Sequence, residues 1–217
     1  MKEISVLIEW LRQRLGEPLP GLRAQELMMG RVIPLPRTVP DNARLSAVLC
    51  LLYPENDELH MLLMKRMEDR TAHSGQVSFP GGRFEAGDGD MQTTALREAH
   101  EEVGVHPAIV DVVGALTPLY IPVSNFNVFP YVGFVNHRPD LNLNRHEVSH
   151  VIAAPLSDLL HDGRKTVADV SSPIMPGLIR NVRAYRLDDG TIIWGATAMI
   201  ISELETILKE FAGNGTS

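Results

Sequence analysis

The stretch GGRFEAGDGDMQTTALREAHEEVGV at residues 81–105 decides the fold of this chain. Its second half carries three carboxylates, Glu98, Glu101 and Glu102, at positions i, i+3 and i+4. On an α-helix these side chains fall within about 100° of arc, where like charges repel one another. A helix of this kind needs a counter-charge, and a hard divalent cation with oxygen ligands is the natural candidate. The preceding Gly81 and Gly82 suit close approach of backbone to a phosphate.

The helix is predicted to begin after Asp90, which can cap it, and to run to about Val103, where Gly104 ends it. Leu96 and Ala99 join Val103 in an apolar face beside the carboxylates. Further helices are expected at 4–15, 157–161 and 197–211, and strands or extended pieces at 46–53, 59–65, 76–79, 109–119, 128–135, 148–154, 182–187 and 191–194. Because two strand pairs are joined by short turns, the expected class is α/β or α+β with a mixed sheet.

Composition excludes several classes of protein. The 217 residues are 44% apolar and 22% charged, as in a soluble globular chain with a sizeable core. The net charge of −7 argues against a non-specific nucleic-acid binder. Cys50 is the single cysteine and lies in an apolar run, which indicates a buried side chain and a reducing compartment. No apolar run approaches the roughly 20 residues of a membrane span, and residues 1–3 do not begin a signal peptide, so a cytoplasmic protein is expected.

The chain is expected to hold one main domain. Residues 1–43 form an N-terminal helix followed by a proline-rich arm, the regular fold covers 44–211, and 212–217 form a flexible tail. A homodimer remains open, with the N-terminal helix and its arm as the candidate contact.

Flanking residues make the carboxylate triplet more specific. Arg97 directly precedes it, and Gly104 and Val105 follow it, so that residues 97–105 read REAHEEVGV. This resembles the second half of the Nudix box, Gly-x5-Glu-x7-Arg-Glu-U-x-Glu-Glu-x-Gly-U with U aliphatic, if Ala99 takes the first U position. The resemblance covers roughly residues 44–205. It implies the Nudix fold, an α/β/α sandwich with a mixed β-sheet.

The first half of the box departs from this pattern. Counted from Gly82, the acidic position falls on Asp88, and eight residues separate Asp88 from Arg97. Such an insertion resembles the branch of the family that cleaves coenzyme A and its derivatives. That branch also carries Leu-Leu-Thr…Arg…Gly-Gln-x-Ser-Phe-Pro-Gly-Gly, similar to LLMKR at 62–66 and HSGQVSFPGG at 73–82, although Met64 replaces threonine and Arg70 is shifted by one. Residues 193–198, IWGATA, resemble the end of coenzyme A pyrophosphatases.

The resemblance implies hydrolysis of the pyrophosphate bond of a nucleoside diphosphate derivative. Coenzyme A or an acyl-coenzyme A would give 3′,5′-ADP and free or acylated 4′-phosphopantetheine. Mg²⁺ or Mn²⁺, held by Glu98, Glu101 and Glu102 and by analogy by the carbonyl of Gly82, would neutralise the phosphates and activate a water. Arg97 would pair with the glutamates and fix their rotamers.

Two further acids have expected roles with open alternatives. Asp88 would assist at the first turn of the helix, although Glu85 or Asp90 could serve instead. The general base is expected outside the box at Glu147, directly before an expected strand, and a solvated loop glutamate is the alternative.

Polar groups upstream of the box are candidates for binding the substrate. Arginine binds phosphate through its two-pronged guanidinium, but a loop packed on a sheet also uses polar groups to satisfy its own backbone. The expected substrate-binding residues are Arg66, Arg70, Gln76, Ser78, Gly81 and Gly82.

Other functions remain open at this stage. The nearest alternative is the same chemistry on ADP-ribose, a dinucleotide or a nucleoside triphosphate. A second is a non-catalytic Nudix-like domain that senses nucleotides or binds proteins. All three box glutamates are present, which favours the enzyme. In either enzymatic case the partner is a small nucleotide-containing substrate, not a nucleic acid or a membrane.

Overall fold

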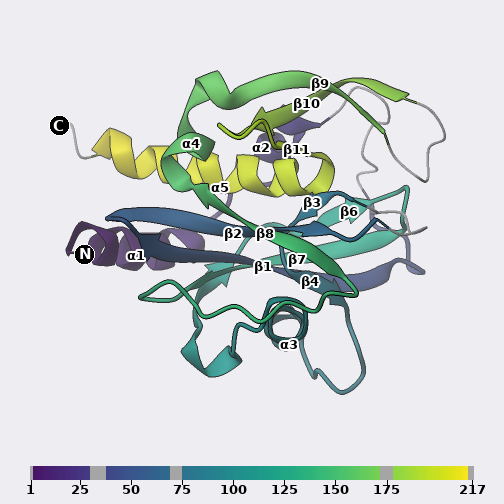
Figure 1. The fold of residues 1–217 in the computed structure, drawn as a ribbon, viewed down its shortest axis with the longest axis horizontal. Helices are drawn as coiled ribbons and strands as arrows, with labels where there is room; N and C mark the ends of the chain where they lie inside the picture. The colour runs from purple at the N-terminus through teal and green to yellow at the C-terminus, as the bar shows by residue number, and fades with distance from the viewer. Residues whose placement is uncertain (1, 30–37, 69–74, 172–177, 215–217) are drawn as a thin grey trace.

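A mixed eight-stranded sheet forms the centre of the molecule (Figure 1). The computed structural model describes residues 2–29, 38–68, 75–171 and 178–214. Strands β3, β2, β1, β7 and β5 follow one another across the sheet, while β4 pairs with β1, β6 with β7 and β8 with β2. Strands β1 and β7 run parallel, and the other pairings are antiparallel. The strands are β1 (Arg44–Glu55), β2 (Glu58–Arg66), β3 (Val77–Ser78), β4 (Gly81–Arg83), β5 (Asp111–Ala115), β6 (Leu119–Ile121), β7 (Phe126–Phe134) and β8 (Val148–Pro155).

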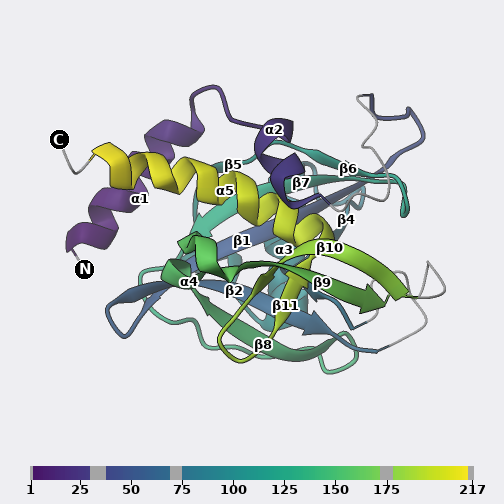
Figure 2. The same cartoon turned by 90° about the horizontal axis from the view of Figure 1, so that it is seen from above.

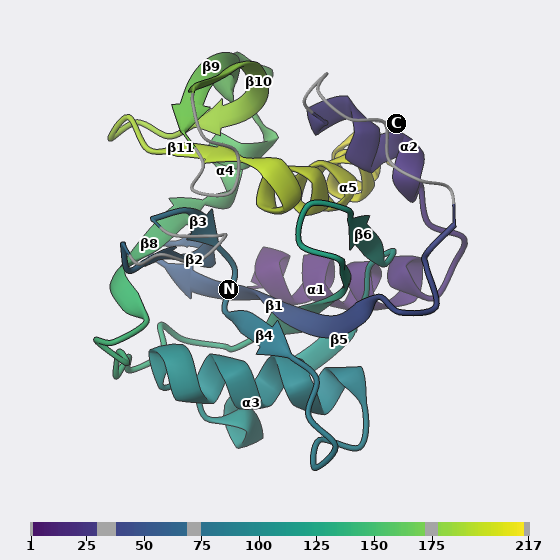
Figure 3. The ribbon, with the colours of Figure 1, turned by 90° about the vertical axis from the view of Figure 1, so that its right-hand side faces the viewer.

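Helices cover both faces of this sheet. Figure 3 shows α3 on one side and α5 on the other, and Figure 2 shows α1 crossing one end of α5. A second, antiparallel sheet of three strands in the order β11-β10-β9 lies beyond α5. These elements are α1 (Lys2–Leu15), α2 (Leu22–Gln25), α3 (Met91–Val103), α4 (Leu156–Leu160), α5 (Gly195–Asn214), β9 (Lys165–Ser171), β10 (Leu178–Arg186), β11 (Ile192–Trp194) and the 3₁₀ turns η1 (Glu26–Met28), η2 (Pro107–Ile109) and η3 (Asp162–Arg164).

Strand β1 explains why the apolar run around Cys50 is continuous. Side chains alternate between the two faces of a strand. Leu49 and Leu51 lie in the core beneath α3, whereas Cys50 and Leu52 lie in the core that α1 and α5 cover. All four are fully buried. The predicted burial of Cys50 is therefore confirmed, and so is the α/β/α arrangement with a mixed sheet.

Most predicted elements are present with shifted ends. The strand expected at 109–119 is interrupted, because β5 ends at Ala115 and the chain begins the separate strand β6 at Leu119. Strand β9 was not expected, since no clear alternation of apolar and polar residues marks it in the sequence. The short strand β4, which follows the Phe79-Pro80 turn, was also not expected.

The N-terminal segment packs against the main fold. Ile8, Leu11 and Leu15 of α1 are buried in the same core as Cys50. The apolar face of α1, a candidate dimer contact, thus lies against the chain's own core.

A buried glutamate holds the following part of the arm. Glu203 of α5 accepts hydrogen bonds from the backbone N–H of Gly21 at 3.0 Å and from Nε2 of Gln25 at 2.9 Å. The backbone N–H and Oγ1 of Thr117 also donate to it, at 3.2 and 2.6 Å. Four donors compensate the burial of this carboxylate. Among the helices described, none has the length and apolar character needed to cross a membrane.

Candidate active site

The carboxylate helix α3 has the ends that the sequence predicts. Asp90 caps it, because its carboxylate accepts a hydrogen bond from the backbone N–H of Thr93 at 2.7 Å. Gly104 ends it in the left-handed conformation with a φ of 82°, and a Cβ at this position would lie 2.6 Å from the backbone nitrogen of Asn142. Ala99 and Val103 are buried against the sheet. Glu102 belongs to this buried face, and Glu98 and Glu101 are more exposed.

Gly81 and Gly82, which begin strand β4, touch two of the three box glutamates. Strand β4 pairs with β1 so closely that a Cβ on Gly81 would lie 2.4 Å from the carbonyl oxygen of Ala47. The N–H of Gly81 donates to Oε2 of Glu102 at 2.8 Å. A Cβ on Gly82 would lie 2.4 Å from the carboxylate of Glu98. Two glycines in sequence therefore make room for backbone-to-carboxylate contact, which larger residues would prevent.

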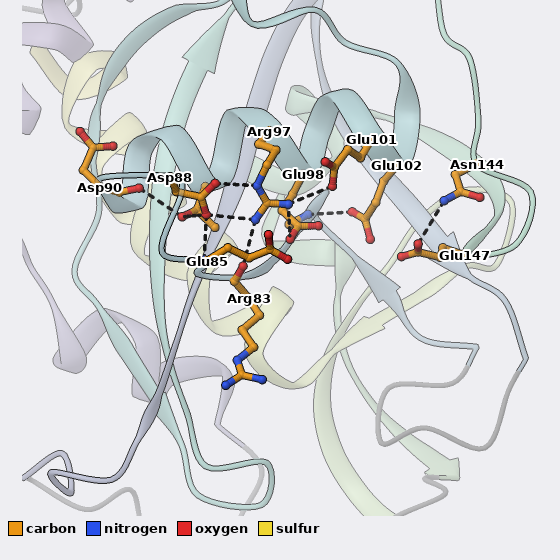
Figure 4. Close-up of polar contacts among 12 residues, drawn as sticks. Arg83, Glu85, Asp88, Asp90, Arg97, Glu98, Glu101, Glu102, Asn144 and Glu147 are labelled. Atoms are coloured by element: carbon orange, nitrogen blue, oxygen red, sulfur yellow. Dashed lines mark hydrogen bonds and ion pairs between the residues drawn. The ribbon is translucent and has the colours of Figure 1, made fainter.

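Arg97 joins three carboxylates at the start of the site (Figure 4). Its Nε and Nη2 contact the two oxygens of Asp88 at 2.6 and 3.0 Å. Its Nη1 lies 3.0 Å from Oε1 of Glu98 and 2.9 Å from Oε2 of Glu101. Nη2 also donates to the carbonyl of Arg83 at 3.0 Å. The structure thus places Arg97 where it can fix the rotamers of two box glutamates.

Asp88 anchors Arg97 through the two hydrogen bonds between them. Its side chain is 4% exposed and accepts further hydrogen bonds from Oγ1 of Thr94 and the backbone N–H of Glu85, at 2.8 and 2.9 Å. The bidentate contact with Arg97 holds the pKa of Asp88 well below its usual range. Of the three acids considered for this position, Glu85 contributes its backbone and Asp90 caps the helix. Asp88 therefore contacts Arg97 despite the extra residue between them.

Replacing Asp88 with asparagine is expected to destabilise the protein by about 2 kcal/mol at pH 7, because charge-assisted hydrogen bonds to Arg97 are weakened. A carboxylate with a lowered pKa stabilises the fold above its unfolded pKa of about 3.9, and this contribution is lost as the pH falls below that value. Urea unfolding from pH 7 to pH 3 should show the difference between wild type and D88N shrinking below about pH 4. The exposed Glu85→Gln is the matched control. A difference that stays constant down to pH 3 would contradict this assignment.

The three box glutamates differ strongly in burial. The Glu102 side chain is 2% exposed, Glu98 is 15% exposed and Glu101 is 55% exposed. Burial raises the pKa of Glu102 to about 7 and also raises the pKa of Glu98. The positive groups around them compensate this burial only in part: Arg66 donates to Oε1 of Glu102 at 2.9 Å, and Arg97 lies beside Glu98.

The donors suit a hard divalent cation. Glu98 and Glu102 are carboxylates whose burial leaves negative charge without full compensation, and Glu98 lies against Gly82. Across the described ranges, no three acidic, histidine or cysteine side chains converge on one point closely enough to hold a metal ion as they lie. In this arrangement Glu101 contacts Arg97 and Glu102 contacts Arg66. Exposed Glu101 can turn without disturbing the core.

Glu147 reaches the site because the segment before it is bound to the end of α3. The backbone N–H groups of Asn142 and Asn144 donate to the carbonyls of Val103 and Glu102, at 3.0 and 2.9 Å. The side chain of Asn144 donates to Oε1 of Glu147 at 3.1 Å. Sequence reasoning missed Asn144, and only its position three residues before the expected base could have indicated it. The expected strand after Glu147 is confirmed as β8.

The predicted substrate-binding residues upstream of the box lie in different surroundings. Arg66, at the end of β2, contacts Glu102 and also lies 3.9 Å from Glu147. The carbonyl of Gln76 accepts the backbone N–H of Arg66 at 3.0 Å. Ser78 pairs with β2, and within the described residues its buried Oγ has no hydrogen-bond partner. Arg70 lies outside the described residues.

Comparisons with known proteins show the family of this chain. The family model described as the NUDIX domain matches residues 43–176, more than half of the chain. Nudix hydrolase 22, chloroplastic, of Arabidopsis thaliana is 33% identical over 167 residues, which cover 76% of this chain and 55% of that protein. An uncharacterized Nudix hydrolase, NudL, of Enterobacter sp. (strain 638) is 36% identical over 169 residues, or 75% of this chain and 82% of that protein. The chain spans little more than half the length of the plant relatives that it matches.

A solved structure supports the fold alone. The MutT/nudix family protein from Enterococcus faecalis superposes with a TM-score of 0.52 at 18% identity, over 82% of this chain and 66% of that chain.

Proposed function

The chain belongs to the NUDIX domain family, and from this premise we propose that it hydrolyses the pyrophosphate bond of a nucleoside diphosphate derivative with Mg²⁺ or Mn²⁺. One observation carries the proposal: buried Glu102 and partly buried Glu98 lie against Gly81 and Gly82 of β4, in a family whose relatives are named Nudix hydrolases. The carboxylates that would bind the cation are therefore in contact with the backbone that would bind the phosphate.

The residues divide the work of the proposed reaction. Glu98, Glu101 and Glu102, with the carbonyl of Gly82, would hold the cation. When bound, the cation would supply neutralisation of the phosphate charge and activation of a water. Arg97 keeps Glu98 and Glu101 in place through its anchor on Asp88. Binding in a partly buried site strengthens these charge interactions, because water screens them less.

Glu147 is the proposed general base. Its side chain is 48% exposed, so that a water can reach it. Asn144 holds one carboxylate oxygen and leaves the other to act as acceptor. A base of this kind would take the proton of the attacking water as the bond to phosphorus forms.

Coenzyme A or an acyl-coenzyme A is the proposed substrate. The support is the inserted residue between Asp88 and Arg97 and the HSGQVSFPGG stretch at residues 73–82. Gly81 and Gly82 at the start of β4 would contact the diphosphate, and Gln76 and Ser78 would bind the substrate nearby, with Arg70. The products would be 3′,5′-ADP and free or acylated 4′-phosphopantetheine.

A substrate panel tests the proposal. Coenzyme A, acetyl-coenzyme A, ADP-ribose, NADH and dGTP are incubated with the protein and Mg²⁺ or Mn²⁺, and products are separated by chromatography. We expect the highest kcat/KM for coenzyme A or its acyl form, with 3′,5′-ADP as product. A higher kcat/KM for ADP-ribose, NADH or dGTP would retain the chemistry and replace the substrate. Nucleotide binding without hydrolysis of any of the five would favour the non-catalytic alternative.

A further inference from the structure

Arg66 lies between two carboxylates that come from distant parts of the chain. Its Nη1 is 2.9 Å from Oε1 of Glu102 on α3, and its Nη2 is 3.9 Å from Oε2 of Glu147 before β8. The backbone of Arg66 is fixed at the end of β2 by its pairing with Val148 and by its N–H bond to Gln76. The guanidinium therefore extends from a rigid strand into the carboxylate site.

Glu102 depends on this guanidinium in the arrangement observed. Its side chain is 2% exposed, and its two oxygens are taken by Arg66 and by the N–H of Gly81. A buried carboxylate that loses its positive partner is strongly unfavourable. A cation bound through Oε1 of Glu102 would take the position that the Arg66 guanidinium occupies.

The two arginines of the site are held differently. Arg97 is anchored by two hydrogen bonds to buried Asp88 and by a third to the carbonyl of Arg83. Within the described residues, the short side-chain contact of Arg66 is the one to Glu102, and its second carboxylate, on Glu147, lies beyond hydrogen-bond distance. By the described contacts, Arg66 can thus leave Glu102 at lower cost than Arg97 can leave its anchor.

We propose that Arg66 is the resident counter-charge of Glu102 in the metal-free protein, and that cation loading proceeds by exchange of this guanidinium for the cation. Arg66 is then a positioning residue that acts through Glu102, and its charge competes with the cation. The inference rests on the proposed metal site. It predicts that removal of the charge tightens metal binding, which removal of an arginine without contact to a metal-binding carboxylate would not do.

The test is Mn²⁺ binding without nucleotide, measured by calorimetric titration of the full chain. Arg66→Met removes the charge and keeps an apolar stem, and Arg66→Lys keeps the charge. Arg83→Met is the matched control, because its side chain points away from the box carboxylates in Figure 4. We expect R66M to bind Mn²⁺ about tenfold more tightly than wild type, since a charged hydrogen bond no longer competes. R66K and R83M should stay close to wild type.

Thermal unfolding gives an independent reading. Metal-free R66M should melt below wild type, because Glu102 has lost its counter-charge, and saturating Mn²⁺ should close most of this gap. If wild type binds no Mn²⁺, the proposed metal site fails and the inference fails with it. If wild type binds Mn²⁺ and R66M binds it equally or more weakly, the inference alone is overturned.

Discussion

Replacing Glu102 with glutamine is expected to lower kcat/KM for the proposed hydrolysis by at least about a thousandfold. A metal ion at the phosphates contributes several kcal/mol to the transition state, and each 1.4 kcal/mol is about a factor of ten in rate. Glutamine has the size of glutamate and still accepts the N–H of Gly81, but it removes the charge that a cation needs. The loss should appear in kcat with every substrate that wild type cleaves, because the cation serves the reaction and not one particular nucleotide.

The fold of this variant should be preserved. Burial raises the pKa of Glu102 to about 7, and a raised carboxylate pKa means that its contribution to stability is lost as the pH rises from about 4.3 through 7. Above pH 7 wild type without metal carries a buried charge that E102Q lacks, while E102Q loses the ion pair with Arg66. Because these effects oppose each other, the Tm at pH 8 should stay within about 4 °C of wild type. Exposed Glu85→Gln should keep full activity. Near-normal turnover by folded E102Q would exclude the proposed metal role.

Capping residues and apolar patterns in the sequence predicted structure most accurately where that structure depends on only a few neighbouring residues. Asp90 and Gly104 set the two ends of α3, because capping needs only the neighbouring turn of the helix. The apolar positions of β1 and β2 were equally clear, since a strand buried on both faces has to be apolar throughout. The mixed sheet and the helix layers followed from these elements and their turns.

Contacts between distant segments could not be read in the same way. Arg66, Glu102 and Glu147 meet only because β2 pairs with β8 and because the loop before β8 is bonded to the end of α3. No periodicity in the sequence encodes that meeting. Arg66 was expected to bind a phosphate, which stays a prediction, and its contacts with Glu102 and Glu147 were not foreseen. Burial could not be predicted from spacing either. The spacing placed Glu101 and Glu102 on one side of the helix, but it did not show that Glu101 is exposed and Glu102 is buried.

Replacing Gly82 with alanine is expected to lower kcat about a hundredfold while leaving stability nearly unchanged. The new Cβ would lie 2.4 Å from the Glu98 carboxylate, which is the far end of a flexible side chain and can turn away. The backbone of Gly82 does not require the left-handed region, so alanine is tolerated by the strand itself. Displacement of a reacting group by about 1 Å costs about a hundredfold in rate. Activity and urea unfolding of the same preparation separate the two effects.

Alanine substitutions at Gly87 and Gly81 are the controls for this prediction. A Cβ on Gly87 would meet nothing within 4 Å, so Gly87→Ala should leave both activity and stability unchanged. A Cβ on Gly81 would meet the carbonyl oxygen of Ala47 at 2.4 Å, and backbone cannot turn aside as a side chain can. Gly81→Ala should therefore cost about 2 kcal/mol of stability or more. If Gly82→Ala loses stability as Gly81→Ala does, the contact with Glu98 is structural; if it stays fully active, Glu98 has no part in the reaction.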